Sequence, residues 1–549
     1  MFRNLSLQVC LSLLIASGVS AALSASAAYS VEPQITPTPT ATPTPSTSLK
    51  PIVTPSPTPT PRIQTLEELQ SKIRQRVFSS DVRRGRVGVK IVSLNSGKMI
   101  FENDSEKYFM PASNMKNFTV AAALEKLGPD FKFVTSVYAN SHPDANGTIL
   151  SDLRIYGRGD ISISTAFFGT SASDPETYHK GIDRLVDRIA AAGVKRVEGS
   201  IVGDESHFKG FAIPGTWEWD DLQWYYGAEI SALSINDNAV DISVMPGSTV
   251  GSPCVVTISP PNTLFQINST CTTGGARRAL GINKRLDRNV LEITGSIPSN
   301  DAGYRSSITI THPADLFVSI LKQRLEKRGI PVAGTARTMV PNTVIDTNVE
   351  IAKLESPPFR EIAAKTMKPS QNMFTETILW TLGEYARERS SSESTANGVS
   401  SGIRDSFQLG IAAVKEFSTS IGIPADGIVQ HDGSGLSRHD LITPSAVVTL
   451  YTHMANKSRH AQVWSDSLTI GGVDGTLANR FRGTAAAGNI RGKTGTIDQV
   501  SALSGYMTTA AGERLVLSIV VNGVPETRTR TSLIDAIVTD LANFNGKIN

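Results

Sequence analysis

The chain has 549 residues, which is too long for a single ordinary hydrophobic core and predicts two to four domains. Hydrophobic residues make up 40% of the sequence and charged residues 19%, as in globular proteins, and the formal net charge is +3. With so small a net charge and no clustered basic face, nucleic-acid binding is not indicated. The eight histidines never fall at i, i+4 spacing and cysteines are scarce, so we expect no metal site and no cofactor.

The N-terminus has the pattern of an export signal. Arg3 supplies a positive charge, residues 5–23 are mainly apolar, and the small residues at 25–27 offer a cleavage site. A membrane anchor is the alternative, but Gln8 and the serine and glycine content make this run a poor span. We therefore expect a signal peptide over 1–27 and an exported protein with at most peripheral membrane contact.

A linker is expected next, over residues 28–62. This stretch is dominated by proline, threonine and serine and cannot bury a core. Such a composition predicts an extended polyproline-II tether.

Regular structure is expected from residue 66, where helical spacing begins and continues to about 78. Two alternating runs, 87–94 and 98–102, are joined by an Asn-Ser-Gly turn and predict a β-hairpin. A helix is expected over 119–127. It is apolar on nearly every side, which is typical of a helix in the middle of a domain.

The character of the chain changes between residues 131 and 339, where short alternating runs and Gly/Asn/Pro turns predominate. We expect strands at 133–138, 149–156, 240–244, 255–258 and 291–297, and helices at 181–192 and 314–327. This mostly β block predicts one or two domains inserted at 131–339 into a first domain made of 63–130 and 340–549.

Cys254 and Cys271 lie inside that block and are the only cysteines outside the predicted signal. In an oxidising compartment they are expected to form a disulfide. Two free buried thiols are the alternative.

The C-terminal part returns to helices and then to strands. Helical spacing is followed by a polar serine-rich loop and another helix, and two strands joined by a short turn must pair antiparallel. The expected elements are helices at 372–389, 407–421 and 532–544, a loop at 390–394, and strands at 500–508 and 514–522.

Ser113 and Lys116 form the first motif that carries chemistry. On a helix they share a face, so the amine lies within reach of the hydroxyl. A lysine with a lowered pKa can take the proton of the serine and make it a nucleophile. Taken alone, S-x-x-K is as well explained by an N-cap serine and a solvated lysine.

Ser370 and Asn372 form a second motif, S-x-N, at the start of a predicted helix. Asn372 could bind Lys116 and a substrate carbonyl, and Ser370 could relay a proton to a departing amine. An ordinary helix cap is the alternative.

The third motif is G-K-T-G-T, which precedes a predicted strand. Lys493 supplies a cation for a substrate carboxylate, Thr494 and Thr496 supply hydroxyls, and Gly495 lets the backbone approach a ligand closely. A nucleotide-binding P-loop is excluded, because alanine occupies the position six residues before Lys493 where glycine is required.

S-x-x-K, S-x-N and K-T-G occur here in the order found in penicillin-binding proteins and serine β-lactamases. From residue 66 onward the chain resembles the D-alanyl-D-alanine carboxypeptidases of the class C low-molecular-mass penicillin-binding proteins, the S13 peptidase family. The long insert and the runs at 156–160, 203–208, 227–238 and 432–438 add to this resemblance. It implies an α+β fold with a serine β-lactamase/penicillin-binding transpeptidase-like domain, an antiparallel sheet flanked by helices, and a β-rich insertion.

The resemblance also implies an acyl-enzyme mechanism. Ser113 would be acylated by the penultimate D-Ala carbonyl, with Lys116 as its base. Ser370 would pass a proton to the leaving D-Ala, and Asn372 would position the substrate. The charge of Lys493 in the same cleft would lower the pKa of Lys116.

Substrate binding is implied for the third motif. Lys493, Thr494 and Thr496 would hold the terminal carboxylate. The backbone N–H groups of Ser113 and Thr496 would form an oxyanion hole, worth ~3 kcal/mol per donor.

Asp160 and Arg438 match family residues that bind the diamino-acid side chain of the peptide. Ile161 stands where the family usually has proline. We interpret the D-G-S-G-L-S run at 432–437 as a turn-rich loop at the rim of the site. A nucleophile elbow is excluded there, because its first position is aspartate and not glycine.

The sequence therefore predicts an exported serine-type D-Ala-D-Ala carboxypeptidase, with DD-endopeptidase activity as a related option, in the bacterial periplasm or cell-wall space. Its partners would be peptidoglycan stem peptides ending in D-Ala-D-Ala, with penicillin and other β-lactam antibiotics as inhibitors. The alternatives are a β-lactamase and a non-catalytic cell-wall-binding or sensor module. A β-lactamase needs a deacylating base, and Ser370 stands where one class has tyrosine.

Overall fold

The computed structural model describes residues 62–169, 175–340, 349–394 and 405–548. The predicted signal peptide, and the linker apart from Arg62, lie outside the described residues. Among the described helices, none is long and apolar enough to span a bilayer.

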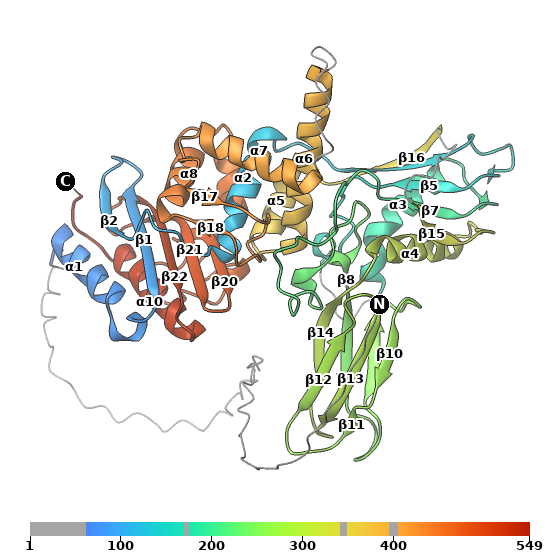
Figure 1. The fold of residues 1–549 in the computed structure, drawn as a ribbon, viewed down its shortest axis with the longest axis horizontal. Helices are drawn as coiled ribbons and strands as arrows, with labels where there is room; N and C mark the ends of the chain where they lie inside the picture. The colour runs from blue at the N-terminus through green and yellow to red at the C-terminus, as the bar shows by residue number, and fades with distance from the viewer. Residues whose placement is uncertain (1–61, 170–174, 341–348, 395–404, 549) are drawn as a thin grey trace, which may run out of the picture. The chain divides into compact units, whose positions relative to one another are not determined.

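A six-stranded antiparallel sheet has the order β19-β20-β21-β22-β1-β2. The predicted hairpin is present, and its first strand pairs with the C-terminal strand β22, Arg86 opposite Asn522 and Ser93 opposite Leu515. The N-terminal and C-terminal parts of the described chain are thereby joined in one sheet. In Figure 1 the blue strand β1 lies beside the red strand β22. The strands are β1 (Arg86–Ser93), β2 (Met99–Asn103), β19 (Thr469–Ile470), β20 (Arg491–Ile497), β21 (Val500–Thr508) and β22 (Arg514–Asn522).

Helices cover both faces of this sheet (Figure 1). One face packs against α1 (Leu66–Val77) and α10 (Thr527–Ala542) through one hydrophobic cluster. A second cluster joins the helices of the other side, which are α2 (Lys116–Lys126), α5 (Phe359–Met367), α6 (Asn372–Ser394), α7 (Ser406–Ser420), α8 (Pro444–Asn456) and α9 (Ala461–Ser467). Strand β22 is buried on both faces, as expected for a central strand between two helical layers.

Helix α2 is the innermost of these helices. Every residue from Lys116 to Leu124 is buried, which confirms the central helix predicted from its apolar composition. Lysine at the first position of such a helix is therefore removed from water.

The region expected to be inserted contains a second sheet, with the order β15-β7-β5-β3-β16, whose last strand lies beyond the expected boundary at residue 339. Helices α3 (Lys180–Ala191) and α4 (Pro313–Lys327) pack with it through a third hydrophobic cluster. The single strand expected over 149–156 is wrong, because its two ends pair in different sheets. The strands are β3 (Val134–Ala139), β4 (Thr148–Ile149), β5 (Leu153–Tyr156), β6 (Arg196–Val197), β7 (Ile201–Asp204), β15 (Ala336–Thr338) and β16 (Val349–Glu355).

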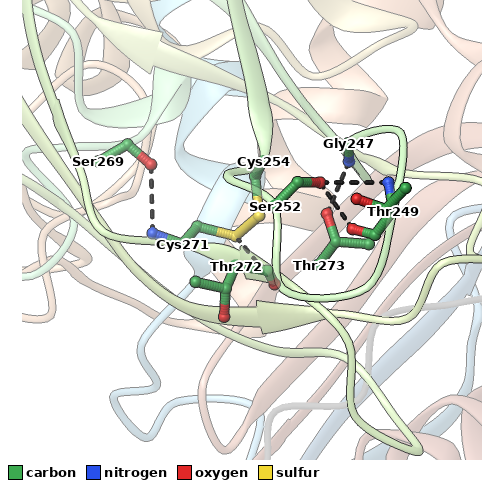
Figure 2. Close-up of a disulfide and its surroundings, with 8 residues drawn as sticks. All are labelled: Gly247, Thr249, Ser252, Cys254, Ser269, Cys271, Thr272 and Thr273. Atoms are coloured by element: carbon green, nitrogen blue, oxygen red, sulfur yellow. Dashed lines mark hydrogen bonds between the residues drawn. A yellow bond between two sulfur atoms is a disulfide. The ribbon is translucent and has the colours of Figure 1, made fainter.

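A smaller all-β module lies between residues 239 and 309 and has its own core. Cys254 and Cys271 belong to that core and form a disulfide, with their Cα atoms 5.4 Å apart (Figure 2). The strands are β8 (Ala239–Met245), β9 (Val255–Ser259), β10 (Gln266–Ser269), β11 (Thr272–Thr273), β12 (Ala279–Lys284), β13 (Val290–Ile297) and β14 (Tyr304–Thr309).

Three other expectations need correction. The loop expected at 390–394 is part of α6, and α10 begins at Thr527, five residues before the expected start at 532. Both extensions consist mainly of polar residues, which the apolar periodicity does not register. The K-T-G motif does not precede a strand but lies within β20.

The remaining short elements connect these layers. They are η1 (Ser80–Val82), η2 (Ala112–Met115), η3 (Thr165–Phe167), η4 (Pro175–His179), η5 (Tyr225–Gly227), η6 (Asn236–Asn238), η7 (Gly475–Leu477), β17 (Ile428–Val429) and β18 (Leu441–Ile442). Two of them, η2 and η5, carry residues of the site.

Candidate active site

The structure brings the three motifs together around two buried lysines. Lys116 Nζ lies 2.9 Å from Ser113 Oγ and 2.6 Å from Asn372 Oδ1. Lys493 Nζ lies 2.7 Å from Ser370 Oγ. Helix α2, the start of α6 and strand β20 thus contribute to one hydrogen-bonded cluster, although their residues are hundreds of positions apart.

Ser113 lies in η2, a 3₁₀ turn that leads directly into α2. Asn114 attaches this turn to the sheet: its Nδ2 donates to Lys493 O at 3.2 Å, and its Oδ1 accepts from Ser504 Oγ. A Cβ at Gly495 would lie 2.5 Å from Pro111 O, so glycine lets β20 approach η2. The close backbone approach at this glycine is therefore to the turn that carries Ser113, and not to a ligand.

Gly435 also packs closely against the backbone of this turn. Its φ is +80°, and a Cβ there would lie 1.8 Å from Ala112 O. Ala112 itself has φ +46°, an uncommon value for a residue other than glycine. The backbone around Ser113 is thus held in a sparsely populated conformation, which needs close support from its neighbours.

We expect Gly435→Ala to lower the free energy of unfolding by more than about 3 kcal/mol, because it adds a clash with backbone to a left-handed φ. Gly97→Ala is the matched control, since Gly97 has φ +74° and nothing within 4 Å of the added Cβ. It should cost only the left-handed penalty of roughly 1–2 kcal/mol. Urea unfolding of both variants measures the difference, and equal losses would contradict the role of Gly435.

Lys116 is fully buried, and its Nζ also donates to Ser434 O at 2.8 Å. Burial lowers the pKa of Lys116 to about 7, although three neighbouring carboxyl groups oppose this. In the described part of the chain neither Lys116 nor Lys493 has a carboxylate within 4.0 Å. An amine with this pKa is available as a base near neutral pH.

The expected cause of this lowered pKa was wrong in one respect. Desolvation, and not the charge of Lys493, is what lowers the pKa of Lys116. The charge of Lys116 instead acts on Lys493. Burial first, and then this charge, hold the pKa of Lys493 well below its usual range.

The remaining residues of the third motif differ in exposure. Thr494 is buried and its hydroxyl donates to Thr476 Oγ1 at 2.7 Å, whereas Thr496 is exposed. Ser370, at φ +66°, is half-buried beside Lys493. Hydroxyl groups and one amine therefore lie along β20 next to the Ser113 turn.

Arg438 and Asp160 differ in their contacts. Arg438 donates to Asp498 O at 3.1 Å, just beyond β20, and forms an ion pair with Glu218 at 2.8 Å. Asp160 is buried and accepts from Ser162 N at 2.8 Å, while burial raises its pKa to about 6. No hydrogen bond or ion pair among the described residues links Asp160 to the cluster around Ser113.

The loop at 432–437 was expected at the rim of the site. This expectation is wrong, because the loop is buried behind Lys116. Ser434 supplies one acceptor for the lysine, and Asp432 Oδ2 accepts from Trp217 Nε1 at 2.9 Å. Asn372 Nδ2 donates to Tyr226 O at 2.9 Å. Trp217 and Tyr226 belong to the inserted region, so that region contacts the site directly.

Sequence reasoning missed Glu376, Trp217 and Tyr226. Glu376 lies four residues after Asn372, so helical spacing could have indicated a second side chain on the same face. Trp217 and Tyr226 carry no local signal, because their role comes only from the packing of the inserted region on α6 and on the 432–437 loop.

The comparisons with known proteins agree with this geometry. Residues 69–544 match the model of the "D-Ala-D-Ala carboxypeptidase 3 (S13) family". A D-alanyl-D-alanine carboxypeptidase of Actinomadura sp. (strain R39) is 33% identical over 473 residues, which cover 84% of this chain and 81% of the relative.

Solved structures show the same fold. The crystal structure of penicillin binding protein 4 from Haemophilus influenzae superposes with a TM-score of 0.70 at 23% identity, over 87% of this chain and 99% of that one. The same protein complexed with a β-lactam superposes with a TM-score of 0.64 at 21% identity, over 86% of this chain and 98% of that one. The expected fold, a penicillin-binding domain with antiparallel sheet and flanking helices, is confirmed.

Proposed function

Because the chain belongs to the S13 family of D-Ala-D-Ala carboxypeptidases, and is thus a serine-type peptidase, we propose that it hydrolyses the terminal D-Ala-D-Ala bond of peptidoglycan stem peptides through an ester of Ser113. The observation that carries the proposal is the hydrogen-bonded contact of Ser113, Lys116 and Asn372 beside the Lys493–Ser370 pair. DD-endopeptidase action on cross-links uses the same chemistry and is part of the proposal.

The donors and acceptors around Lys116 suit a general base. A neutral amine has two N–H groups and one lone pair. If the two N–H groups are donated to Asn372 Oδ1 and Ser434 O, the lone pair faces the Ser113 hydroxyl. Lys116 then takes the hydroxyl proton as Ser113 Oγ bonds to the penultimate D-Ala carbonyl carbon.

The second half of the cluster serves the leaving group and the carboxylate. As the C–N bond breaks, the proton that Lys116 took from Ser113 passes to the departing D-Ala amine through the Ser370 hydroxyl, which leaves Lys116 neutral. Lys116 then takes a proton from the water that attacks the ester, and that proton returns to Ser113 Oγ as the ester bond breaks. The terminal carboxylate of the substrate would bind the Lys493 amine, with Thr494 and Thr496 as further hydrogen-bond donors. We place the oxyanion at the backbone N–H groups of Ser113 and Thr496.

The substrate side chain is the finer part of the proposal. Arg438 lies beside the end of β20, where a peptide held by the third motif would extend. We propose Arg438 as the contact for the diamino-acid side chain. Asp160 has no such support, because its hydrogen bond stays within its own segment.

Export and β-lactam inhibition complete the proposal. The N-terminal pattern and the disulfide between Cys254 and Cys271 support an oxidising compartment outside the cytoplasm. A β-lactam resembles the D-Ala-D-Ala end and would acylate Ser113, and the related Haemophilus protein has been solved with a β-lactam.

Acylation should depend on pH through Lys116. Its pKa is lowered to about 7, and only the neutral amine can accept a proton. We expect the second-order rate with fluorescent penicillin to fall about tenfold per pH unit below pH 7 and to level off above it. Stopped-flow or gel readings between about pH 5 and pH 9 measure this, and a rate that increases toward acid would contradict it.

The deciding experiment is mass spectrometry of the protein after incubation with benzylpenicillin, followed by mapping of the modified peptide. A stable adduct on the peptide containing Ser113, with release of free D-Ala from a pentapeptide, supports the peptidase. Rapid turnover of nitrocefin would favour a β-lactamase. Binding of muropeptides without an adduct and without D-Ala release would favour a non-catalytic receptor.

A further inference from the structure

Glu376 is a buried carboxyl group one helical turn after Asn372. Its Oε1 accepts from Gly433 N at 3.0 Å and from Ser434 N at 2.7 Å, and its Oε2 accepts from Gly433 N at 2.9 Å. Residues four apart share a face of a helix, so α6 presents Asn372 and Glu376 toward the same place. One side chain contacts Lys116 directly, and the other accepts from the backbone N–H of Ser434, the residue whose carbonyl contacts Lys116.

We propose that Glu376 is a positioning residue for the acylation step, holding the Gly433–Ser434 backbone so that the Ser434 carbonyl fixes the orientation of the Lys116 amine. The inference rests on the proposed function. With two acceptors fixed at Asn372 and Ser434, the lone pair of the neutral amine has one direction left, toward Ser113. If the Ser434 carbonyl turned away, an N–H of the amine could point at Ser113 Oγ, which is the wrong polarity for a base.

Glu376 also belongs to the charges that face Lys116. These are Glu376 on α6, Asp432 and Asp440 in the buried loop, and Lys493 on β20. The three carboxyl groups raise the pKa of Lys116 against the effect of burial. Burial and the neighbouring Asp432 raise the pKa of Glu376 itself to about 8, so at and below pH 7 this carboxyl is mostly protonated.

Three variants test whether the position of the Glu376 carboxyl matters for acylation. Glu376→Gln keeps the size but has one acceptor oxygen, and its NH₂ group faces an amide N–H. We expect the plateau acylation rate to fall by roughly 10- to 100-fold, as for a small misplacement of a catalytic group. The fall of the rate below pH 7 should stay in place, because the Glu376 carboxyl is mostly protonated there and its replacement removes little charge.

Glu376→Asp keeps the carboxyl group but is one methylene shorter. The level acylation rate above pH 7 (the plateau) should therefore fall, while the fall of the rate below pH 7 (the acid limb) stays in place. Glu384→Gln is the matched control on the same helix. Glu384 is buried and accepts from Ser406 Oγ and from Arg387, outside the cluster around Lys116. That variant should leave both the plateau and the acid limb unchanged.

A readout that needs no turnover completes the test. In protein carrying [ε-¹³C]lysine, the Lys116 signal is assigned by its loss in Lys116→Arg and its titration midpoint is followed by NMR. We expect the midpoint to stay near pH 7 in all three variants, so that a lower plateau reports the orientation of the amine and not its pKa. A wild-type plateau in Glu376→Gln, a midpoint shift large enough to account for the slower rate, or losses of thermal stability alone that are equal in Glu376→Gln and Glu384→Gln, would overturn the role of Glu376. A Lys116 midpoint near pH 7 in a wild-type protein that forms no penicillin adduct would overturn only the proposed function.

Discussion

Ser113→Ala should abolish both the covalent penicillin adduct and the release of D-Ala from a pentapeptide. We expect the acylation rate to fall by at least about 10³-fold, because the hydroxyl that contacts Lys116 is removed and only binding and oxyanion stabilisation remain. Intact-mass measurement after incubation with benzylpenicillin gives the adduct, and a D-amino-acid oxidase assay gives the D-Ala. The variant should still bind substrate, since Lys493 and the β20 threonines are unchanged.

Stability separates this effect from unfolding. The Ser113 hydroxyl is half-buried and contacts Lys116, so its loss should change the free energy of unfolding by no more than about 1 kcal/mol. Ser80→Ala, at an exposed serine in η1, is the control and should keep full acylation. An adduct that forms at the wild-type rate in Ser113→Ala would refute the assignment of the nucleophile.

Lys116→Met should slow acylation by about 10²- to 10⁴-fold, which is the usual contribution of a general base. Methionine has nearly the same length and removes the amine. The residual rate should also lose the acid limb near pH 7, because the titrating group is gone. Fluorescent penicillin across the pH range measures both quantities in one experiment.

The stability of Lys116→Met should change little. The variant removes the cost of burying an amine but leaves Asn372 Oδ1 and Ser434 O without their donor, each worth about 1–3 kcal/mol. Lys284→Met is a matched control, because Lys284 is also buried, with its pKa lowered to about 8, but donates to Thr311 Oγ1 and Arg285 O in the inserted region. That control should acylate at the wild-type rate; an equal loss in both variants would show that burial of lysine, and not its role as base, is being measured.

Local patterns were sufficient for most single elements. Strands β21 and β22 have the bounds expected from alternation, and α2 is as buried as its composition implies. Failures occurred where polar residues extend an element, as at the end of α6 and the start of α10, because periodicity reads only the apolar residues. The 149–156 run failed for another reason: its two ends belong to different sheets, and register between distant strands is not a local property.

What the sequence by itself determined is the chemistry available to this protein: a serine and a lysine at helical spacing, a second serine with an amide, and a second lysine beside two threonines, in the order found in penicillin-binding proteins and serine β-lactamases. What only the tertiary structure decided is the state of those groups. The pKa of Lys116 follows from burial by α6, β20 and the 432–437 loop, and its orientation follows from acceptors on Asn372 and Ser434. Desolvation and hydrogen-bond direction are sums over neighbours that lie far apart in the chain, so no local pattern can contain them.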